Sequence, residues 1–422
     1  MSNPSTLQPV ATLPTMTTTP PVDPPYISSC TPQPVRVEHT HADGSKEHKV
    51  LVLGTGGTIA SEPTSEGYKP ISELWARNVF FKRIRQHPQL SDAPPASFNS
   101  EVVSTPVGKN LRYPPLRTPP LDEHDNTVVY EILDLENHMD SSEMQPSDWN
   151  KIAELIHENW DAYEGFVVLS GTDTLAYTSS ILTFLFAGAG KPIVVTGAQI
   201  PLREPRSDGW YNLLESLLVA GTLPFAGVSV VFYHQALQGC RATKSSPNLL
   251  KAFETPSVPA WINLNVKVTA LPDLQRRDDT PPPPLVTLES FPTVLSCAIY
   301  PGITGSVLAA QIHSMPTCKA VIVSAFGSGN LPIKEETGVL QALEAAVKRE
   351  ILVVVISTCH VPNIYPLYAL GVRLLSVGVL PGFDMTHEAA FAKSIWLVSR
   401  KDLNFKQRQE LFQTPIAGEM TI

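Results

Sequence analysis

The sequence of 422 residues has few cysteines and lacks any long apolar segment. Its five cysteines are odd in number, widely scattered and without metal-ligand spacing, so we expect reduced thiols in a cytoplasmic protein; they are Cys30, Cys240, Cys297, Cys318 and Cys359. No apolar run approaches the roughly 18 to 20 residues that a membrane-spanning helix needs. We therefore expect a soluble protein with no membrane partner.

The chain also lacks an excess of positive charge. Its formal net charge is -9, whereas nucleic acids and anionic membrane surfaces are bound through surplus lysine and arginine. We therefore expect no nucleic-acid partner. The first 34 residues, rich in Pro, Thr and Ser, lack the basic and apolar regions of a secretory signal and the arginine-rich pattern of a transit peptide. We interpret residues 1–47 as a disordered tail.

The length and the order of elements predict two domains. Strands alternate with helices over residues 48–270, which predicts a parallel sheet covered on both faces. Within it, residues 91–126 are rich in proline, which cannot pair inside a sheet, so we expect a surface insertion. Four consecutive prolines mark residues 271–292 as a stiff linker. Residues 293–422 repeat the rhythm at smaller scale. The predicted fold class is α/β, with a larger N-terminal parallel-sheet domain, flanking helices and a smaller C-terminal three-layer α/β domain.

Hydroxyl side chains follow two of the buried strands. One aliphatic strand, at residues 49–53, ends in a glycine-rich turn, and another, at residues 165–169, ends in a turn directly before a helix. In open parallel sheets ligands bind beyond the carboxyl ends of the strands, so we expect both turns to line one pocket. Together the two turns carry Thr55, Thr58, Thr172 and Asp173.

Other strand ends and one loop extend this set. Ser141, Ser142 and Lys244 lie beyond other strands, and the loop at residues 62–70 is a candidate lid that carries Tyr68. The set contains hydroxyl nucleophiles, a carboxylate and an amine but no histidine. A threonine needs a neighbour to remove its proton, and the candidates are Tyr68 or a lysine whose pKa is lowered by burial. Backbone N–H groups of the glycine turn can stabilise an oxyanion, so acyl transfer from an amide or ester fits.

Each of these residues also has an ordinary structural interpretation. Thr58, Thr172 and Asp173 can cap helices, Lys244 can be a solvated charge, and Tyr68 can lie on a surface loop. The glycine-rich turn can also cradle a phosphate, although it lacks the Gly-Lys-Ser/Thr ending and a downstream ribose-binding pattern.

The combination of the two turns resembles a known family. Thr55-Gly56-Gly57-Thr58-Ile59-Ala60 and Gly171-Thr172-Asp173-Thr174 are similar to the signature motifs of bacterial-type L-asparaginases, closest to the cytosolic type I branch. Serine stands at position 170, where the family usually has histidine. The likeness continues through Gly197-Ala198-Gln199, Ser207-Asp208 with Asn212, Arg241-Ala242-Thr243-Lys244, Ser324-Ala325 with Gly329-Asn330, and Gly382-Phe383-Asp384-Met385-Thr386.

This resemblance implies hydrolysis of the side-chain amide of L-asparagine to L-aspartate and ammonia, through an acyl-enzyme and without a cofactor or metal. It makes Thr58 the nucleophile and makes Tyr68, on a mobile lid, a residue that helps to activate Thr58. Thr172 and Lys244 would support proton transfer, while Asp173 would hold the α-ammonium group of the substrate. These expectations follow from the matched motifs.

The resemblance also implies substrate contacts and an assembly. Ser141, with Ser142 beside it, would meet the α-carboxylate of the substrate. Asn330 would be a further contact, and the family's pattern implies a homodimer or homotetramer in which the second domain completes a neighbouring site. Two alternatives stay open: a glutaminase or ammonia-donating amidase subunit, and a silent amino-acid-binding module. One methylene group changes binding by only about 1 to 3 kcal/mol, so the sequence does not fix asparagine against glutamine.

Overall fold

The structure, a computed structural model, describes residues 33–34, 47–65, 67–71, 73–93, 104–107, 109–122, 125–290, 293–364 and 369–422. All of them belong to one compact unit, Pro32 to Ile422. The predicted tail at residues 1–47 lies outside the described residues apart from positions 33, 34 and 47.

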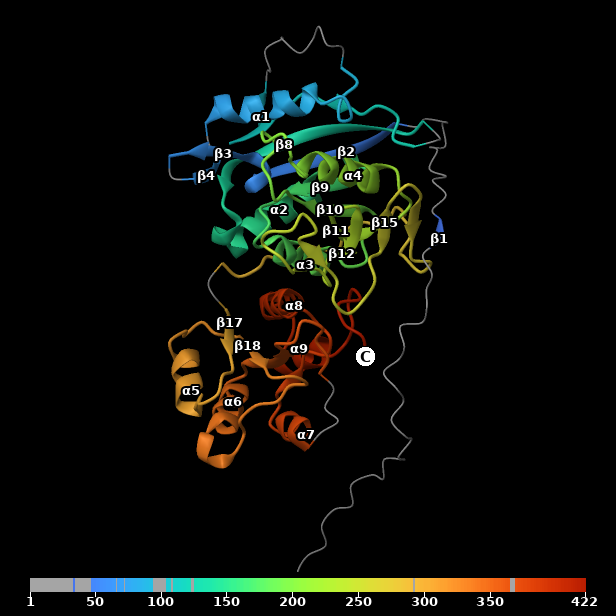
Figure 1. The fold of residues 1–422 in the computed structure, drawn as a ribbon. Helices are drawn as coiled ribbons and strands as arrows, with labels where there is room; N and C mark the ends of the chain where they lie inside the picture. The colour runs from blue at the N-terminus through green and yellow to red at the C-terminus, as the bar shows by residue number, and fades with distance from the viewer. Residues whose placement is uncertain are drawn as a thin grey trace, which may run out of the picture. The chain divides into compact units, whose positions relative to one another are not determined.

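A sheet of 12 strands forms the larger part of the fold (Figure 1). Its centre is parallel and runs in the order β8, β2, β9, β10, β11. β9 and β10 have five residues each and are buried throughout, as parallel strands between two layers of helices require. Their bounds are β2 (Glu47–Gly56), β8 (Thr127–Met139), β9 (Gly165–Leu169), β10 (Pro192–Thr196) and β11 (Gly227–Phe232).

The two edges of this sheet are antiparallel, so the prediction of a parallel sheet holds only for its centre. Beyond β11 lie β12 (Gln235–Gln238), β15 (Ile262–Leu264), β16 (Val268–Ala270) and β1 (Gln33–Pro34). Tyr233 and His234, with φ of 48° and 61°, form the tight turn that reverses the chain after β11.

At the other edge, three strands come from the segment expected to be an unpaired insertion, residues 91–126. They are β5 (Thr105–Val107), β6 (Asn110–Arg112) and β7 (Leu116–Arg117). β6 and β7 pair with β8, while β5 pairs with β6. Proline is tolerated here because Pro106 lies in β5, the last strand of the sheet. The backbone N–H that proline lacks is not needed there, because no further described strand pairs with this edge. Part of this segment therefore pairs at the edge of the sheet, while its assignment as an insertion stays a prediction.

Side-chain alternation in the central strands divides the interior into two cores. Val50 and Val52 of β2 face a core that includes α1 (Leu74–Gln86) and α4 (Gly209–Gly221). Leu51 and Leu53 face the opposite core, with α2 (Pro146–Glu158) and α3 (Leu175–Leu185). The helices thus cover both faces of the sheet, as predicted.

A second, parallel sheet of four strands has the order β17, β18, β19, β20. Val321 and Val323 face a core with α5 and α6, while Ala320 and Ile322 face the core that contains α3 and α8. The elements are β17 (Val294–Ala298), α5 (Gly305–His313), β18 (Ala320–Ala325), η5 (Glu335–Thr337), α6 (Val339–Lys348), β19 (Leu352–Ser357), α7 (Ala369–Ser376), β20 (Leu380–Pro381), α8 (His387–Ser399) and α9 (Phe405–Phe412).

Helices α3 and α8 contact each other and share one core between the two sheets. The predicted two-domain α/β fold is confirmed, while the domain boundaries stay a prediction. Within the part of the chain that the structure describes, no helix is long and apolar enough to cross a membrane.

Candidate active site

The turn after β2 carries the first threonines. Gly57, with φ 78°, brings the backbone against the second turn, since a Cβ added there would lie 2.3 Å from Gly171 Cα. Thr58 begins η1 (Thr58–Ala60) and is half-buried. Among the described residues its hydroxyl has no hydrogen-bond partner. Thr55, in contrast, is buried and donates its Oγ1 hydrogen to Leu169 O at 2.8 Å, so it ties the first strand end to the second.

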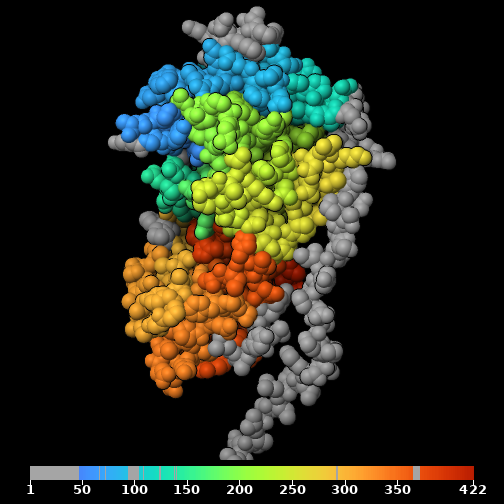
Figure 2. Space-filling view, in the orientation of Figure 1, coloured from blue at the N-terminus to red at the C-terminus, as the bar shows by residue number. Residues whose placement is uncertain are grey.

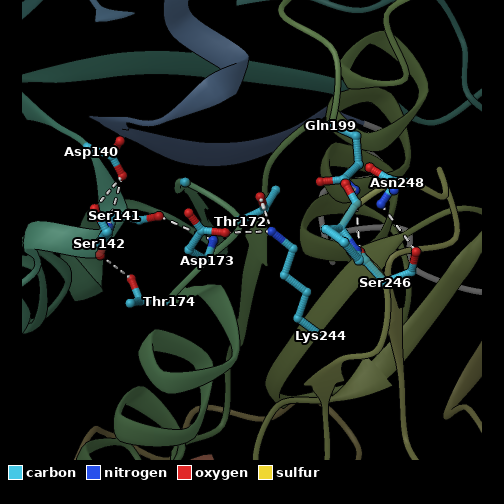
Figure 3. Close-up of polar contacts among 12 residues, drawn as sticks. Asp140, Ser141, Ser142, Thr172, Asp173, Thr174, Gln199, Lys244, Ser246 and Asn248 are labelled. Carbon is cyan, nitrogen blue, oxygen red and sulfur yellow. Dashed lines mark hydrogen bonds and ion pairs between the residues drawn. The ribbon is translucent and has the colours of Figure 1, made fainter. Parts of the chain in front are cut away.

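The turn after β9 forms a connected cluster with Lys244 (Figure 3). Lys244 Nζ donates to Thr172 Oγ1 at 2.9 Å and lies 2.7 Å from Asp173 Oδ1. Thr174 is the N-cap of α3, and its hydroxyl donates to Ser141 O at 2.7 Å. Thr172 and Asp173 therefore do not cap this helix. With 18% of its side chain exposed, Lys244 is not a freely solvated charge.

The serine turn joins the same cluster. Ser141 begins η3 (Ser141–Glu143), is buried, and its Oγ accepts a hydrogen bond from Asp173 N at 3.2 Å. Because a hydroxyl has one hydrogen and two lone pairs, Ser141 can still donate to a ligand. Ser142 is exposed, and both its N–H and its hydroxyl donate to Asp140 Oδ1 at 3.0 Å. The structure thus brings Ser141 directly to the Thr172–Asp173 turn and holds Ser142 one position away.

Tyr68 lies in a hairpin of β3 (Ser61–Thr64) and β4 (Gly67–Pro70), where a loop was expected. The ring is 53% exposed, and the hydroxyl donates to Glu204 Oε1 at 2.9 Å. This hydrogen bond raises the pKa of Tyr68 above its ordinary value. Arg203 bonds Glu62 of β3, so the hairpin is fastened beside the segment that follows β10. Tyr68 is therefore held by Glu204 rather than by Thr58.

Asn330 lies at the end of a turn that follows β18. Its backbone forms an isolated bridge with Phe326, and the residue is exposed. Among the described residues, no hydrogen bond links Asn330 to the cluster around Lys244.

Residues without an expected role hold Lys244 in place. It belongs to β13 (Thr243–Lys244), which pairs with β14 (Phe253–Glu254). Thr243 Oγ1 donates to Glu388 Oε1 of α8 at 2.8 Å, and burial raises the pKa of Glu388. Because these partners lie far apart in the sequence, no local pattern indicated the contact.

The loop after β13 has a second anchor, Gln199. Its side-chain amide donates to the carbonyl oxygens of Pro247 at 3.0 Å and Leu249 at 3.1 Å (Figure 3). Its backbone N–H donates to Oδ1 of Asp208, and Asp208 is the N-cap residue of α4. The Gly197-Ala198-Gln199 motif was noted in the sequence, but this supporting role was not.

The fold and the cluster together define a class of protein: a two-domain α/β protein whose polar site is built from hydroxyl, lysine and carboxylate groups at strand ends. Within the described residues, no group of His, Cys, Asp or Glu is arranged to hold a metal ion.

Comparisons with known proteins identify the family. The family model for the N-terminal asparaginase domain matches residues 49–275, and the model for the glutaminase/asparaginase C-terminal domain matches residues 293–412. L-asparaginase 1 of Escherichia coli K12 is 33% identical over 383 residues, covering 89% of this chain and 99% of that protein. The chain therefore belongs to the asparaginase family.

Two further similarities agree with this assignment. The crystal structure of L-asparaginase I from Vibrio cholerae has a TM-score of 0.71 and 30% identity, covering 89% of this chain and all of that one (100%). The mouse 60 kDa lysophospholipase is 34% identical over 378 residues, 89% of this chain. This chain spans 63% of the length of that mouse protein.

Proposed function

We propose that the protein hydrolyses L-asparagine to L-aspartate and ammonia. The observation that carries the proposal is the contact of Lys244 Nζ with both Thr172 Oγ1 and Asp173 Oδ1 beside the Thr58 turn. An amine and a hydroxyl in contact provide a path for a proton, and a second hydroxyl nearby provides a nucleophile. Family membership supports the choice of an amide substrate.

In the proposed reaction Thr58 Oγ forms a bond to the amide carbon of the substrate. Its proton passes to the amide nitrogen, the C–N bond breaks and ammonia leaves. Water then attacks the ester carbon, its proton returns to Thr58 Oγ and aspartate is released. Tyr68, Thr172 and Lys244 relay these protons, and backbone N–H groups of the glycine turn stabilise the oxyanion.

The same cluster suits the charged ends of an amino acid. Asp173, whose side chain is 62% exposed, can receive an α-ammonium group while its other side contacts Lys244. Ser141 has a hydroxyl hydrogen left for the α-carboxylate, and Ser142, next to it, can donate a second one once it releases Asp140. These assignments require the hairpin to close, because Tyr68 must leave Glu204 to reach the substrate.

Ammonia release by the purified protein from L-asparagine and, separately, from L-glutamine tests the proposal. We expect release from asparagine that is lost in Thr58→Ala and Thr172→Ala, with circular dichroism unchanged. Activity that survives in both variants would contradict the assigned site. Ammonia from glutamine alone would establish a glutaminase, and tight asparagine binding without product would establish a binding module.

A parallel assay separates amide from ester hydrolysis. Two relatives, from mouse and human, carry the name 60 kDa lysophospholipase, and a threonine nucleophile can in principle cleave a fatty acyl ester. Fatty acid release from lysophosphatidylcholine is measured beside ammonia release. We expect ammonia only, because the polar cluster around Asp173 matches a zwitterionic amino acid.

We also propose a cytoplasmic homodimer or homotetramer in which Asn330 contacts the substrate of a neighbouring subunit. Its exposure supports this role. The free thiols Cys240, Cys297, Cys318 and Cys359 fit a reducing compartment. Light scattering of the purified protein gives the oligomer size, and a monomer with full activity would exclude a shared site.

A further inference from the structure

The turn that leads into Lys244 is buried and held from both sides. Residues 239–242 follow β12, and all four are buried. On one side, Ser179 Oγ of α3 donates to Gly239 O at 2.8 Å. Helix α3 begins directly after Thr172 and Asp173, so the lysine turn and its two partners are fixed to the same helix.

On the other side, the Arg241 side chain contacts three residues of the C-terminal domain. The residue is 4% exposed, and its Nη1 lies 2.8 Å from Asp384 Oδ2. Its Nε donates to Gly418 O at 2.7 Å, and its Nη2 donates to Thr421 Oγ1 at 3.2 Å. Thr421 N in turn donates to Asp384 Oδ1 at 2.7 Å, which closes the ring of contacts. A planar guanidinium with several fixed partners has little freedom to move.

Residues 414–422, which we call the strap, fold around a buried carboxylate. Glu419 is fully buried and accepts hydrogen bonds from the backbone N–H groups of Ile416 and Ala417. Lys393 of α8 lies 2.5 Å from Glu419 Oε1 and donates to Thr414 O at 2.7 Å. The strap is therefore part of the folded core, and in Figure 2 the dark red of the C-terminal end borders the yellow surface.

We propose that Arg241, held by Asp384 and the strap, is a positioning residue that sets where Lys244 Nζ lies between Thr172 and Asp173. The inference rests on the proposed function, in which Lys244 relays protons. Two residues separate Arg241 from Lys244, so a shift of the guanidinium moves the lysine backbone. A misplacement of about 1 Å in a catalytic group can cost about 100-fold in rate.

The test compares the Arg241 contacts with a matched pair elsewhere. The variants are Arg241→Lys, Asp384→Asn and Thr421→Val, with Thr421→Ser as the conservative rescue. The controls are Arg400→Lys and Asp402→Asn, because Arg400 also pairs with an aspartate, and it donates to the two oxygens of Asp402 at 2.7 and 2.6 Å at the surface. For each protein we measure kcat, KM, the pH dependence of kcat and amide hydrogen exchange over residues 239–245.

We expect kcat to fall about 10- to 100-fold in Arg241→Lys and Asp384→Asn, with KM changed less than about threefold. The pH profile of kcat changes, because Lys244, the proposed proton relay, no longer keeps its contacts with Thr172 and Asp173. Exchange over residues 239–245 becomes faster. Thr421→Val shows a smaller effect in the same direction, Thr421→Ser retains the original behaviour, and the control variants change none of these readouts.

If Arg241 has a purely structural role, the variants should lower the melting temperature but leave the pH profile unchanged, and kcat should not fall more than KM changes. This result would overturn the inference. If Asp384→Asn does not fold, the Thr421→Val variant provides the test, because it removes one hydroxyl from an exposed residue and keeps the shape of the side chain. If the unaltered protein releases no ammonia but exchange accelerates only in the Arg241, Asp384 and Thr421 variants, the proposed function fails and the positioning contact stands.

Discussion

Thr172, Asp173, Ser141 and Lys244 form one continuous set of hydrogen bonds, whereas Thr58 and Tyr68 lie outside this set. The first group is anchored by α3, Thr243 and the strap. In the second group, Tyr68 is exposed on a hairpin and bonded to Glu204. Among the described residues no hydrogen bond joins Thr58 to Tyr68. One half of the proposed site is therefore already joined by hydrogen bonds, whereas the other half requires Tyr68 to move toward Thr58.

This difference suits a division of the proposed reaction between a buried cluster and an exposed hairpin. The proposed proton-relay half is built at strand ends and is already joined by hydrogen bonds, an arrangement that favours fast chemistry. The proposed nucleophile half includes a two-stranded hairpin, and such hairpins are only marginally stable by themselves. Substitutions in the first half should impair chemistry, and substitutions in the second should impair closure.

The largest effect is expected for Lys244→Met. Loss of the amine removes the group that contacts both Thr172 and Asp173, so kcat should fall about 1,000-fold, within the range for a general acid or base. Steady-state kinetics of ammonia release measure it. Lys406→Met, at a lysine that is 84% exposed, is the control and should keep full activity. A Lys244 variant with more than a tenth of the original kcat would contradict the relay.

Tyr68→Phe should have the second-largest effect. Removing the hydroxyl should reduce kcat about 100-fold if the closed hairpin delivers Tyr68 to Thr58. Because the ring is 53% exposed, the melting temperature should stay the same. Tyr300→Phe, at a ring that is 49% exposed, is the matched control. Equal activity in both variants would show that the hairpin takes no part in the chemistry.

Ser141→Ala should affect both binding and stability. The buried hydroxyl accepts from Asp173 N, and an unsatisfied donor left there costs about 1 to 2 kcal/mol of unfolding free energy. The KM for asparagine should rise about tenfold, because one hydrogen bond to the α-carboxylate is lost. Urea unfolding and kinetics measure the two effects. Ser142→Ala, at an exposed serine, should change stability less.

Glu204→Ala should have a smaller effect and in the opposite direction. The hydrogen bond to Glu204 raises the pKa of Tyr68, so its removal should bring that pKa back toward the ordinary value. It also removes a contact that closure must break, so kcat/KM should rise about twofold to fivefold. A stopped-flow measurement of closure should show a faster step. A fall in kcat/KM with slower closure would mean that Glu204 serves the closed form.

The smallest effect is expected from His387, where α8 begins. Burial lowers the pKa of His387, so the folded state favours the neutral ring. Its contribution to stability is therefore present above the ordinary pKa of about 6.5 and is lost as the pH falls below it. The free energy of unfolding should decline less steeply below pH 6.5 in His387→Gln. His157→Gln, at an exposed histidine of α2, is the control.

The sequence by itself determined the elements whose signals are local. Buried aliphatic strands, the helix after Asp173 and the glycine turn before Thr58 follow from periodicity and turn chemistry over a few residues. The rule that ligands bind at the carboxyl ends of parallel strands predicts a single pocket lined by Thr55, Thr58, Ser141, Ser142, Thr172, Asp173 and Lys244. The structure joins four of these residues, Ser141, Thr172, Asp173 and Lys244, in one cluster.

Only the tertiary structure decided the contacts that join distant segments. The antiparallel edges of the large sheet depend on which strands meet, which no local pattern fixes. Tyr68 pairs with Glu204, Thr243 with Glu388, and Arg241 with Asp384, across 136, 145 and 143 positions of sequence. These partners meet because burial of the cores folds the chain back on itself, so their geometry belongs to the packed molecule and not to any stretch of its sequence.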